Sequence, residues 1–320
     1  MVSHGTFVAE TAKVTMSEAS VILPNIPLDV KEGLRWAESV LTASEIESAR
    51  LEAQLLLAHA LGVSRVYLLA GIHPEPTYSQ WQDFERLVSQ RSQHVPSAYL
   101  RGEQEFYGLA FHVSPAVLIP RPETELLVEF LLQQKPGLFA DVGTGSGCIA
   151  ISSLVHCWEA WAVAIDLSEA ALKVARSNAA RHGVLERMGL VQGSLLESVQ
   201  EYQFDGIVAN PPYISTSEIP TLQTEVREYE PRMALDGGED GLAIHRKLVM
   251  GAGRVLKSGG WLAVEVAMGQ AEAVATLMEA NGFQKVALQS DLAGIARLVS
   301  GWKCGDRPKK VVKEEVSVWT

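Results

Sequence analysis

The sequence predicts an α/β protein in which a mostly parallel sheet, covered by helices on both faces, follows a small helical domain. Three observations lead to this fold class. After Pro122, seven short apolar runs alternate with helical segments, which is the pattern of a parallel sheet with helical crossovers. Before Pro96, apolar residues recur at helical spacing instead. Between these parts, residues 101–120 alternate around Gly108 like a β-hairpin.

The helical part is expected to form a domain over residues 30–100. Ser44 and Glu47 have the spacing of a capping box, which predicts a helix that begins there and ends at Gly62. A second helical stripe has to end before Pro96, because the residue before a proline disfavours the helical conformation. The members of that stripe are Trp81, Phe84, Leu87 and Val88.

The remaining segments follow from the same patterns. We expect residues 101–123 to form a β-hairpin linker and residues 124–303 to form the domain that contains the sheet. Its strands are expected at 138–142, 162–166, 190–192, 204–209, 261–266, 285–289 and 296–300. Residues 1–29 are expected to be a disordered extension, and residues 304–320 a mobile tail.

The composition excludes several classes of protein. With 320 residues, of which 47% are hydrophobic, the chain can fill one large or two modest domains. Its three cysteines lack C-x-x-C spacing, so we expect no disulfide framework, no metal site and a cytoplasmic location. Charges interrupt every long apolar segment, and residues 1–29 lack the features of a secretion signal. A net charge of −11 argues against wide contact with a nucleic-acid backbone.

A glycine-rich turn follows the first expected strand and opens an apolar helix. Such a turn brings its backbone close to a ligand at the helix N-terminus. A dinucleotide fingerprint needs a glycine where this chain has Cys148, so the turn suits a single nucleoside with a small charged tail better than a pyrophosphate. The residues expected to cradle this ligand are Gly143, Thr144, Gly145, Ser146 and Gly147.

Asp166 ends the second expected strand, at the position where an acidic residue commonly accepts from ribose hydroxyls. Its alternative role is to cap the next helix. Ser168 suits that role better, with Glu169 adding negative charge to the first turn. We therefore expect Asp166 to bind the ribose of the nucleoside ligand.

Asn210-Pro211-Pro212-Tyr213 follows the fourth expected strand. Asn offers both an acceptor and a donor, the prolines leave nearby carbonyls free to accept, and Tyr adds a flat face. These groups suit a planar NH2 group. On its own, the motif is equally typical of a turn after a strand.

Together, these features resemble class I S-adenosylmethionine-dependent methyltransferases that act on an amino or amide nitrogen. Further segments, in consistent order from about residue 30 to residue 302, resemble the PrmC/HemK family, the N5-glutamine methyltransferases of peptide chain release factors. The segments that carry this likeness are EFYG at 105–108, FHVSP at 111–115, LIPRPETE at 118–125, EPRMALDGG at 230–238 and DLAG at 291–294.

The resemblance implies a Rossmann-like sheet of seven strands, whose last strand is antiparallel and lies between its two predecessors. It implies that the helical domain recognises the substrate and that the cofactor is S-adenosyl-L-methionine. The implied reaction methylates the side-chain amide nitrogen (N5) of the glutamine in the Gly-Gly-Gln motif of class I release factors, which aids translation termination. We expect a monomer without membrane or stable nucleic-acid partners.

The resemblance also assigns roles to single residues. The residues expected to bind and orient the substrate amide are Asn210, Pro211, Pro212 and Tyr213, and Asn210 is also expected beside the cofactor. Leu195 is expected to form an apolar wall for adenine, with a helix start as its alternative role. Ser194 stands where the family often has Asp, a stronger acceptor for the adenine amino group. Phe106 and Arg121 are expected in the substrate or cofactor pocket; the alternative is that their hairpin only packs the domains.

The expected mechanism follows from the weakness of an amide nitrogen as a nucleophile, since its lone pair is shared with the carbonyl. The Asn210 side chain and the Pro211 carbonyl are expected to accept from its two N–H groups and to aim its lone pair at the sulfonium methyl. No general base is needed before transfer, because the excess proton leaves afterwards. None of the eight histidines has an acidic partner by spacing.

Two other classes of function share these features. An adenine-N6 methyltransferase acting on DNA or RNA also presents a planar NH2 group to an Asn-Pro-Pro-aromatic motif, but the acidic charge and the helical first domain disfavour it. A nucleotide-binding adaptor that kept only the fold is disfavoured by the intact motif.

Overall fold

The computed structural model describes residues 29–199 and 203–304. It divides into two compact units, with the division between Gln93 and His94. Apart from Asp29 and Cys304, the expected extension at 1–29 and the expected tail at 304–320 lie outside the described residues. In the described parts of the chain, no helix is both long and apolar enough to cross a membrane.

The described part of the first unit, residues 29–93, contains four helices. They are α1 (Val30–Ala43), α2 (Ala49–Leu61), α3 (Arg65–Leu69) and α4 (Tyr78–Ser92). The apolar stripe expected before Pro96 lies on α4, and all four of its members are buried. Phe84 also receives the edge of Trp36 from α1, at 5.9 Å between ring centroids, so aromatic packing joins the first and last helices.

The predicted capping box is wrong. Ser44 ends α1 instead of starting a helix, and α2 begins at Ala49. Glu45 takes a left-handed conformation with φ of 57°, so the Ile46 N–H bonds back to the Leu41 carbonyl at 3.0 Å. This is a Schellman turn, and the burial of Ile46 explains why it prevails over capping.

The second unit begins with the short helix α5 (Ser97–Arg101) and a β-hairpin. Its strands, β1 (Glu103–Phe106) and β2 (Leu109–His112), pair in antiparallel register, as predicted. Tyr107 and Gly108 join them with φ of 51° and 71°, the two left-handed residues of a tight hairpin turn. The buried Asn178 of α8 (Glu169–Arg181) accepts from the His112 N–H and donates to the His112 carbonyl and to the Ser146 carbonyl, so it ties the hairpin to the glycine turn.

Seven strands form the main sheet in the order β5-β4-β3-β6-β7-β9-β8. They are β3 (Leu138–Val142), β4 (Trp161–Asp166), β5 (Met188–Gln192), β6 (Phe204–Ala209), β7 (Leu256–Glu265), β8 (Phe283–Ser290) and β9 (Ala296–Lys303). The five strands β5, β4, β3, β6 and β7 are parallel to one another. Strand β9 lies between β7 and β8 and is antiparallel to both. This confirms the predicted position and direction of the last strand.

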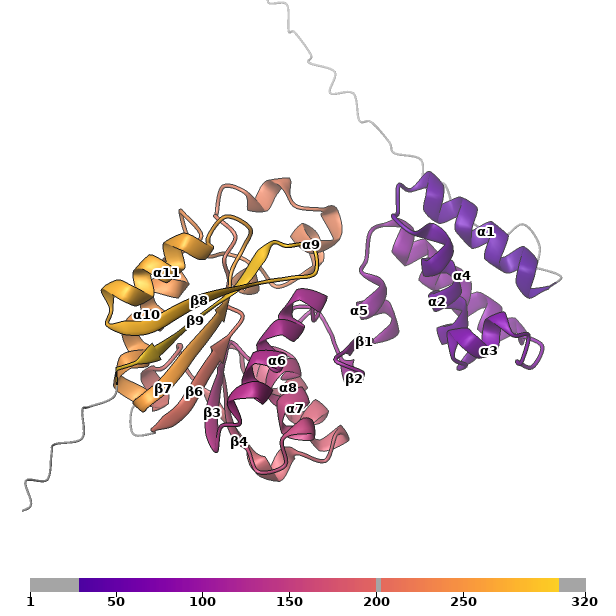
Figure 1. Ribbon diagram of the computed structural model, residues 1–320. Helices are drawn as coiled ribbons and strands as arrows, with labels where there is room; N and C mark the ends of the chain where they lie inside the picture. The colour runs from indigo at the N-terminus through magenta and orange to yellow at the C-terminus, as the bar shows by residue number, and fades with distance from the viewer. Residues whose placement is uncertain (1–28, 200–202, 305–320) are drawn as a thin grey trace, which may run out of the picture. The chain divides into compact units, whose positions relative to one another are not determined.

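Helices cover both faces of the sheet (Figure 1). On one face, α6 (Glu125–Gln134), α7 (Cys148–His156) and α8 pack on an apolar core that includes Leu131, Phe139 and Ile151. On the other face, α10 (Ala243–Val255) and α11 (Ala271–Ala280) pack on a second core that includes Ile165, Ile207 and Leu262. The remaining short helices are η1 (Pro122–Thr124), η2 (Leu185–Arg187), η3 (Glu197–Val199), η4 (Ile219–Thr221), α9 (Thr224–Tyr229) and η5 (Arg232–Ala234).

Candidate active site

A cavity opens at the carboxyl edge of the parallel strands. The loops after β3, β4, β5 and β6 all contribute to its lining. The chain leaves β3 toward β4 on one side and later returns to β6 on the other, so the cavity lies at the point where the strand order reverses. Open parallel sheets bind their ligands at such a point.

The glycine turn forms one wall of the cavity. Gly143, Gly145 and Gly147 have φ of 75°, 54° and 81°, a conformation that residues with side chains rarely adopt. Beneath the turn, the fully buried Asp141 accepts from the Thr144 hydroxyl at 2.7 Å and from the Ala150 N–H at 3.2 Å. Burial raises the pKa of Asp141 to about 6, against the opposing effect of these hydrogen bonds.

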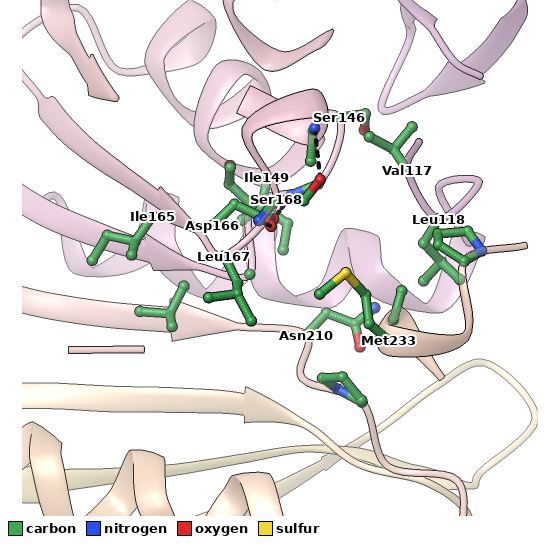
Figure 2. Close-up of a pocket in the computed structure, with 18 of the residues that line it drawn as sticks. Val117, Leu118, Ser146, Ile149, Ile165, Asp166, Leu167, Ser168, Asn210 and Met233 are labelled. Carbon is green, nitrogen blue, oxygen red and sulfur yellow. Dashed lines mark hydrogen bonds between the residues drawn. The ribbon is translucent and has the colours of Figure 1, made fainter. Parts of the chain in front are cut away.

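Asp166 lies beside this turn, as Figure 2 shows. Its Oδ2 accepts from the Gly145 N–H and its Oδ1 from the Ser168 N–H, both at 2.9 Å. Ser168 caps α8 by accepting from the Ala171 N–H, which confirms the prediction that Ser168, and not Asp166, is the capping residue. Each Asp166 oxygen still has a lone pair for a ligand hydroxyl, because a carboxylate offers about four acceptor positions.

The loop after β5 adds Gly193, Ser194 and Leu195 to the lining. Leu195 has φ of 52°, a strained conformation for a leucine, and its side chain is half-buried. Ile165 and Leu167, from the end of β4 and the loop after it, add further apolar side chains to the lining. These side chains offer apolar surface to a flat ring such as a nucleobase.

Asn210 lies at the end of β6 and lines the cavity on the side of Met233 (Figure 2). Its Nδ2 donates to the Thr124 hydroxyl at 3.0 Å, and that hydroxyl donates to Glu265 Oε2 at 2.6 Å. The hydroxyl of Tyr213 donates to the other oxygen, Glu265 Oε1, at 3.2 Å. The carboxyl group of Glu265, at the end of β7, is therefore linked to Asn210 through Thr124 and bonded directly to Tyr213.

Glu265 is an acidic side chain that sequence reasoning did not single out. Only 3% of it is exposed, and burial raises its pKa to about 7 despite the hydrogen bonds from Thr124 and Tyr213. Burial beside Glu265 also raises the pKa of Tyr213, so its phenol stays protonated and serves as a donor. An acidic residue that ends an apolar strand, as at Asp166, was the signal that could have identified Glu265.

The structure brings some of the expected substrate residues to the cavity and not others. Asn210, Pro212 and Arg121 line it. Pro211 is buried, and Tyr213 bonds to Glu265 and does not contribute to the lining. The loop after β6 is held in place by a further hydrogen bond, because the Gln270 side-chain amide donates to the Tyr213 carbonyl at 2.9 Å.

Phe106 is not brought to the cavity. It is 2% exposed and belongs to the core on the face of α6 and α7, where its ring meets Phe111 edge-on at 6.1 Å. The apolar ring of Phe106 is buried in this core, which agrees with the alternative role, packing of the hairpin.

Arg121 combines a place in the lining with an ion pair. Its guanidinium pairs with Oε1 of the buried Glu230, and Oε2 of Glu230 accepts from the Ile119 N–H at 3.4 Å. Burial raises the pKa of Glu230, and Arg121 opposes that rise. The pair thus joins the 118–125 segment to the 230–238 segment, two of the segments that carried the family resemblance.

The donors and acceptors of the cavity fit S-adenosylmethionine. Asp166 can accept from both ribose hydroxyls, and Ile165, Leu167 and Leu195 can enclose a base. The N-terminus of α7 favours a carboxylate, and the three glycines of the left-handed turn allow a ligand to approach the backbone closely. The pattern suits a nucleoside with an amino-acid tail.

Comparison with known proteins agrees with this geometry. Residues 32–102 match the PrmC N-terminal domain family, and residues 122–227 match the methyltransferase small domain family. Among solved structures, the hMettl16 catalytic domain in complex with the MAT2A 3′UTR hairpin 6 is 14% identical, with a TM-score of 0.51 over 69% of this chain and 82% of that chain. At that identity, the likeness concerns the fold alone.

Curated relatives are much more similar. The release factor glutamine methyltransferase of Geobacter sulfurreducens is 43% identical over 85% of this chain and 96% of its own length. Those of Moorella thermoacetica and Nitratidesulfovibrio vulgaris are 41% and 38% identical, over 83% of this chain and 96% and 92% of their own lengths. With this identity over nearly the whole length of its relatives, the chain belongs to the release factor glutamine methyltransferase family.

Proposed function

We propose that this protein transfers a methyl group from S-adenosyl-L-methionine to the side-chain amide nitrogen of the glutamine in the Gly-Gly-Gln motif of class I peptide chain release factors. The observation that carries the proposal is the position of Asn210. It lines the same cavity as the residues expected to bind the cofactor, and its amide nitrogen is hydrogen-bonded to the Thr124 hydroxyl. Family membership adds the substrate class, because the relatives are named for release factor glutamine.

The site residues divide between the two substrates. Gly143, Thr144, Gly145, Ser146 and Gly147 hold the methionine part, Asp166 the ribose and Leu195 the adenine. Asn210, the Pro211 carbonyl and Pro212 form the substrate side of the site, and Tyr213 supports this loop through its hydrogen bond to Glu265. Arg121 closes the cavity next to them through its pair with Glu230.

The chemistry depends on how the amide nitrogen is held. S-adenosylmethionine supplies an electrophilic methyl on a sulfonium. Asn210 Oδ1 and the Pro211 carbonyl accept from the two N–H groups of the glutamine. These two hydrogen bonds favour partial pyramidalisation of the nitrogen, so that its lone pair is less shared with the carbonyl and can point at the methyl group. Positioning of this kind can supply about 7–11 kcal/mol of a barrier. The excess proton leaves the nitrogen after transfer.

The helical first unit recognises the release factor in this proposal. Its third helix and the following turn expose apolar side chains, with Val66, Tyr67, Leu69 and Ile72 all more than half exposed. A contiguous apolar patch is typical of a protein-binding surface. The enzyme acts as a cytoplasmic monomer that binds neither membranes nor nucleic acid stably.

A methyl-transfer assay tests the proposal. The full-length protein is incubated with a release factor and methyl-labelled S-adenosylmethionine, and the label is counted in protein. We expect incorporation that excess DNA or RNA does not reduce. Label in added nucleic acid, with none in the release factor, would instead support the adenine-N6 alternative.

A further inference from the structure

We propose that Glu265 and Thr124 are positioning residues that fix the orientation of the Asn210 amide, so that its oxygen and not its nitrogen is offered to the substrate. The inference rests on the proposed function and adds two residues to its site. Neither residue touches the reacting atoms in this account, since both act through Asn210.

The orientation follows from the direction of each hydrogen bond. An ionised carboxylate can only accept, so the Thr124 hydroxyl has to donate its single hydrogen to Glu265 Oε2. The Thr124 oxygen is then left with lone pairs alone and accepts from its other neighbour. Asn210 therefore turns its Nδ2 toward Thr124, and no donor among the described residues bonds to Asn210 Oδ1.

Burial leaves these hydrogen-bonding groups without alternative partners in solvent. Thr124 is 2% exposed and Glu265 3%, so water does not replace either partner. Because Thr124 lies on η1 and Glu265 at the end of β7, the bond between them also holds the start of α6 against the sheet. The His245 ring donates to the Glu265 backbone carbonyl at 2.9 Å and so fixes the strand end from the other face.

Protonation of Glu265 would reverse the direction of the hydrogen bonds that run from Asn210 through Thr124 to Glu265. A protonated carboxyl can donate to the Thr124 oxygen, and Thr124 can then donate to Asn210 Oδ1, which turns the Asn210 NH2 group toward the substrate. Two NH2 groups would then face each other, and the substrate amide would lose its acceptor. The active form is therefore the carboxylate, so activity should fall as the pH falls through the pKa of Glu265, which is about 7.

The groups around Glu265 come from several elements. Tyr213 donates from the loop after β6, Glu123 on η1 raises the pKa, and Arg297 on β9 lowers it. Cys148 on α7 and His245 on α10 are further titratable groups near Glu265, and the buried Asp141 also acts on Cys148. Burial raises the pKa of Cys148 and lowers that of His245, so both groups are neutral near pH 7. The charge of Glu265 changes near pH 7, whereas that of Asp141 changes at a lower pH, because its pKa is about 6.

The test compares three variants with the wild type in single-turnover methylation of a release factor from pH 6 to pH 9. Thr124→Val keeps the side-chain shape but removes the relay, and we expect a rate about tenfold to 10²-fold lower at pH 8.5. Thr124→Ser keeps the hydroxyl and should restore most of that loss. Glu265→Gln should lower the rate at pH 8.5 and abolish the rise with pH that has its midpoint near 7 in the wild type.

Cofactor affinity and thermal unfolding separate positioning from structural damage. All three variants should bind S-adenosylmethionine like the wild type, with melting curves that confirm folding. If the wild type methylates the release factor, and Thr124→Val and Glu265→Gln keep both its rate and its pH profile, the inference is wrong and the proposed function stands. If Glu265→Gln fails to fold, the valine and serine pair at Thr124 decides alone. A wild type without activity would contradict the proposed function itself.

Discussion

At the residue scale, we propose that the neutral amide of Asn210 lies beside the cationic cofactor, and substitutions of Asn210 test two different properties. Asn210→Ala removes the acceptor but little core volume, so we expect the fold to be kept and kcat to fall about 10²-fold. Asn210→Asp keeps an acceptor but adds a negative charge, which favours the cofactor's ground state over a transition state with dispersed charge. Single-turnover rates of both variants, beside cofactor affinities, check this. A rate for Asn210→Ala within a few-fold of wild type would refute the role of Asn210.

Asp166 allows a separate prediction about cofactor binding. Replacement by Ala removes the acceptor for the ribose and also frees the Gly145 N–H, so we expect affinity for S-adenosylmethionine to weaken by about 1–3 kcal/mol. Asp166→Asn keeps one acceptor oxygen and should lose less. Calorimetry measures both variants, and an unchanged affinity for Asp166→Ala would remove the residue from the site.

The sequence predicts some site residues and misses others for a physical reason. Asp166 and Asn210 could be found because each follows an apolar run, and parallel strands bring their carboxyl ends to one edge. Thr124 lies in a turn before α6, and its proximity to Asn210 depends on how that helix packs on the sheet. Phe106 was expected in the pocket because of its motif, whereas its apolar surface places it in the core.

At the element scale, the glycine turn is the most demanding piece of backbone. A Cβ on Gly147 would lie 2.7 Å from Ile151 Cδ1 and 3.3 Å from Ala175 Cβ, whereas one on Gly183 would meet nothing within 4 Å. Both residues have positive φ, at 81° and 69°, so the two sites share backbone strain but differ in crowding. We expect Gly147→Ala to destabilise the fold by about 1–3 kcal/mol more than Gly183→Ala. Equal losses in denaturant unfolding would show that crowding at the turn is unimportant.

Strand positions were predicted more reliably than helix starts. Buried parallel strands are marked by continuous apolar runs, and the seven expected runs all overlap strands of the sheet. The start of α2 was misplaced because Ser44 and Glu47 match a capping pattern by spacing alone. The left-handed turn at Glu45, which the burial of Ile46 stabilises, depends on tertiary packing that local spacing does not contain.

At the scale of the whole molecule, catalysis and recognition are assigned to different units, and this separation can be measured. Tyr67→Ser and Leu69→Ser remove exposed apolar surface from the first unit, so we expect each to raise KM for the release factor several-fold and to leave kcat and cofactor affinity unchanged. Trp158→Ser is the matched control, because Trp158 is 78% exposed and precedes β4 at the sheet edge opposite the cavity. An equal rise in KM for the control would argue against a specific surface.

The most direct test of the central claim is the site of methylation on the substrate. A release factor is incubated with S-adenosylmethionine and either the wild type or Asn210→Ala, then digested and sequenced by mass spectrometry. We predict that the wild type adds the mass of one methylene group to the glutamine of the Gly-Gly-Gln motif and to no other residue, and that Asn210→Ala adds almost none. An unmodified glutamine after incubation with folded, cofactor-binding wild-type enzyme, or methylation at a different residue, would contradict the account.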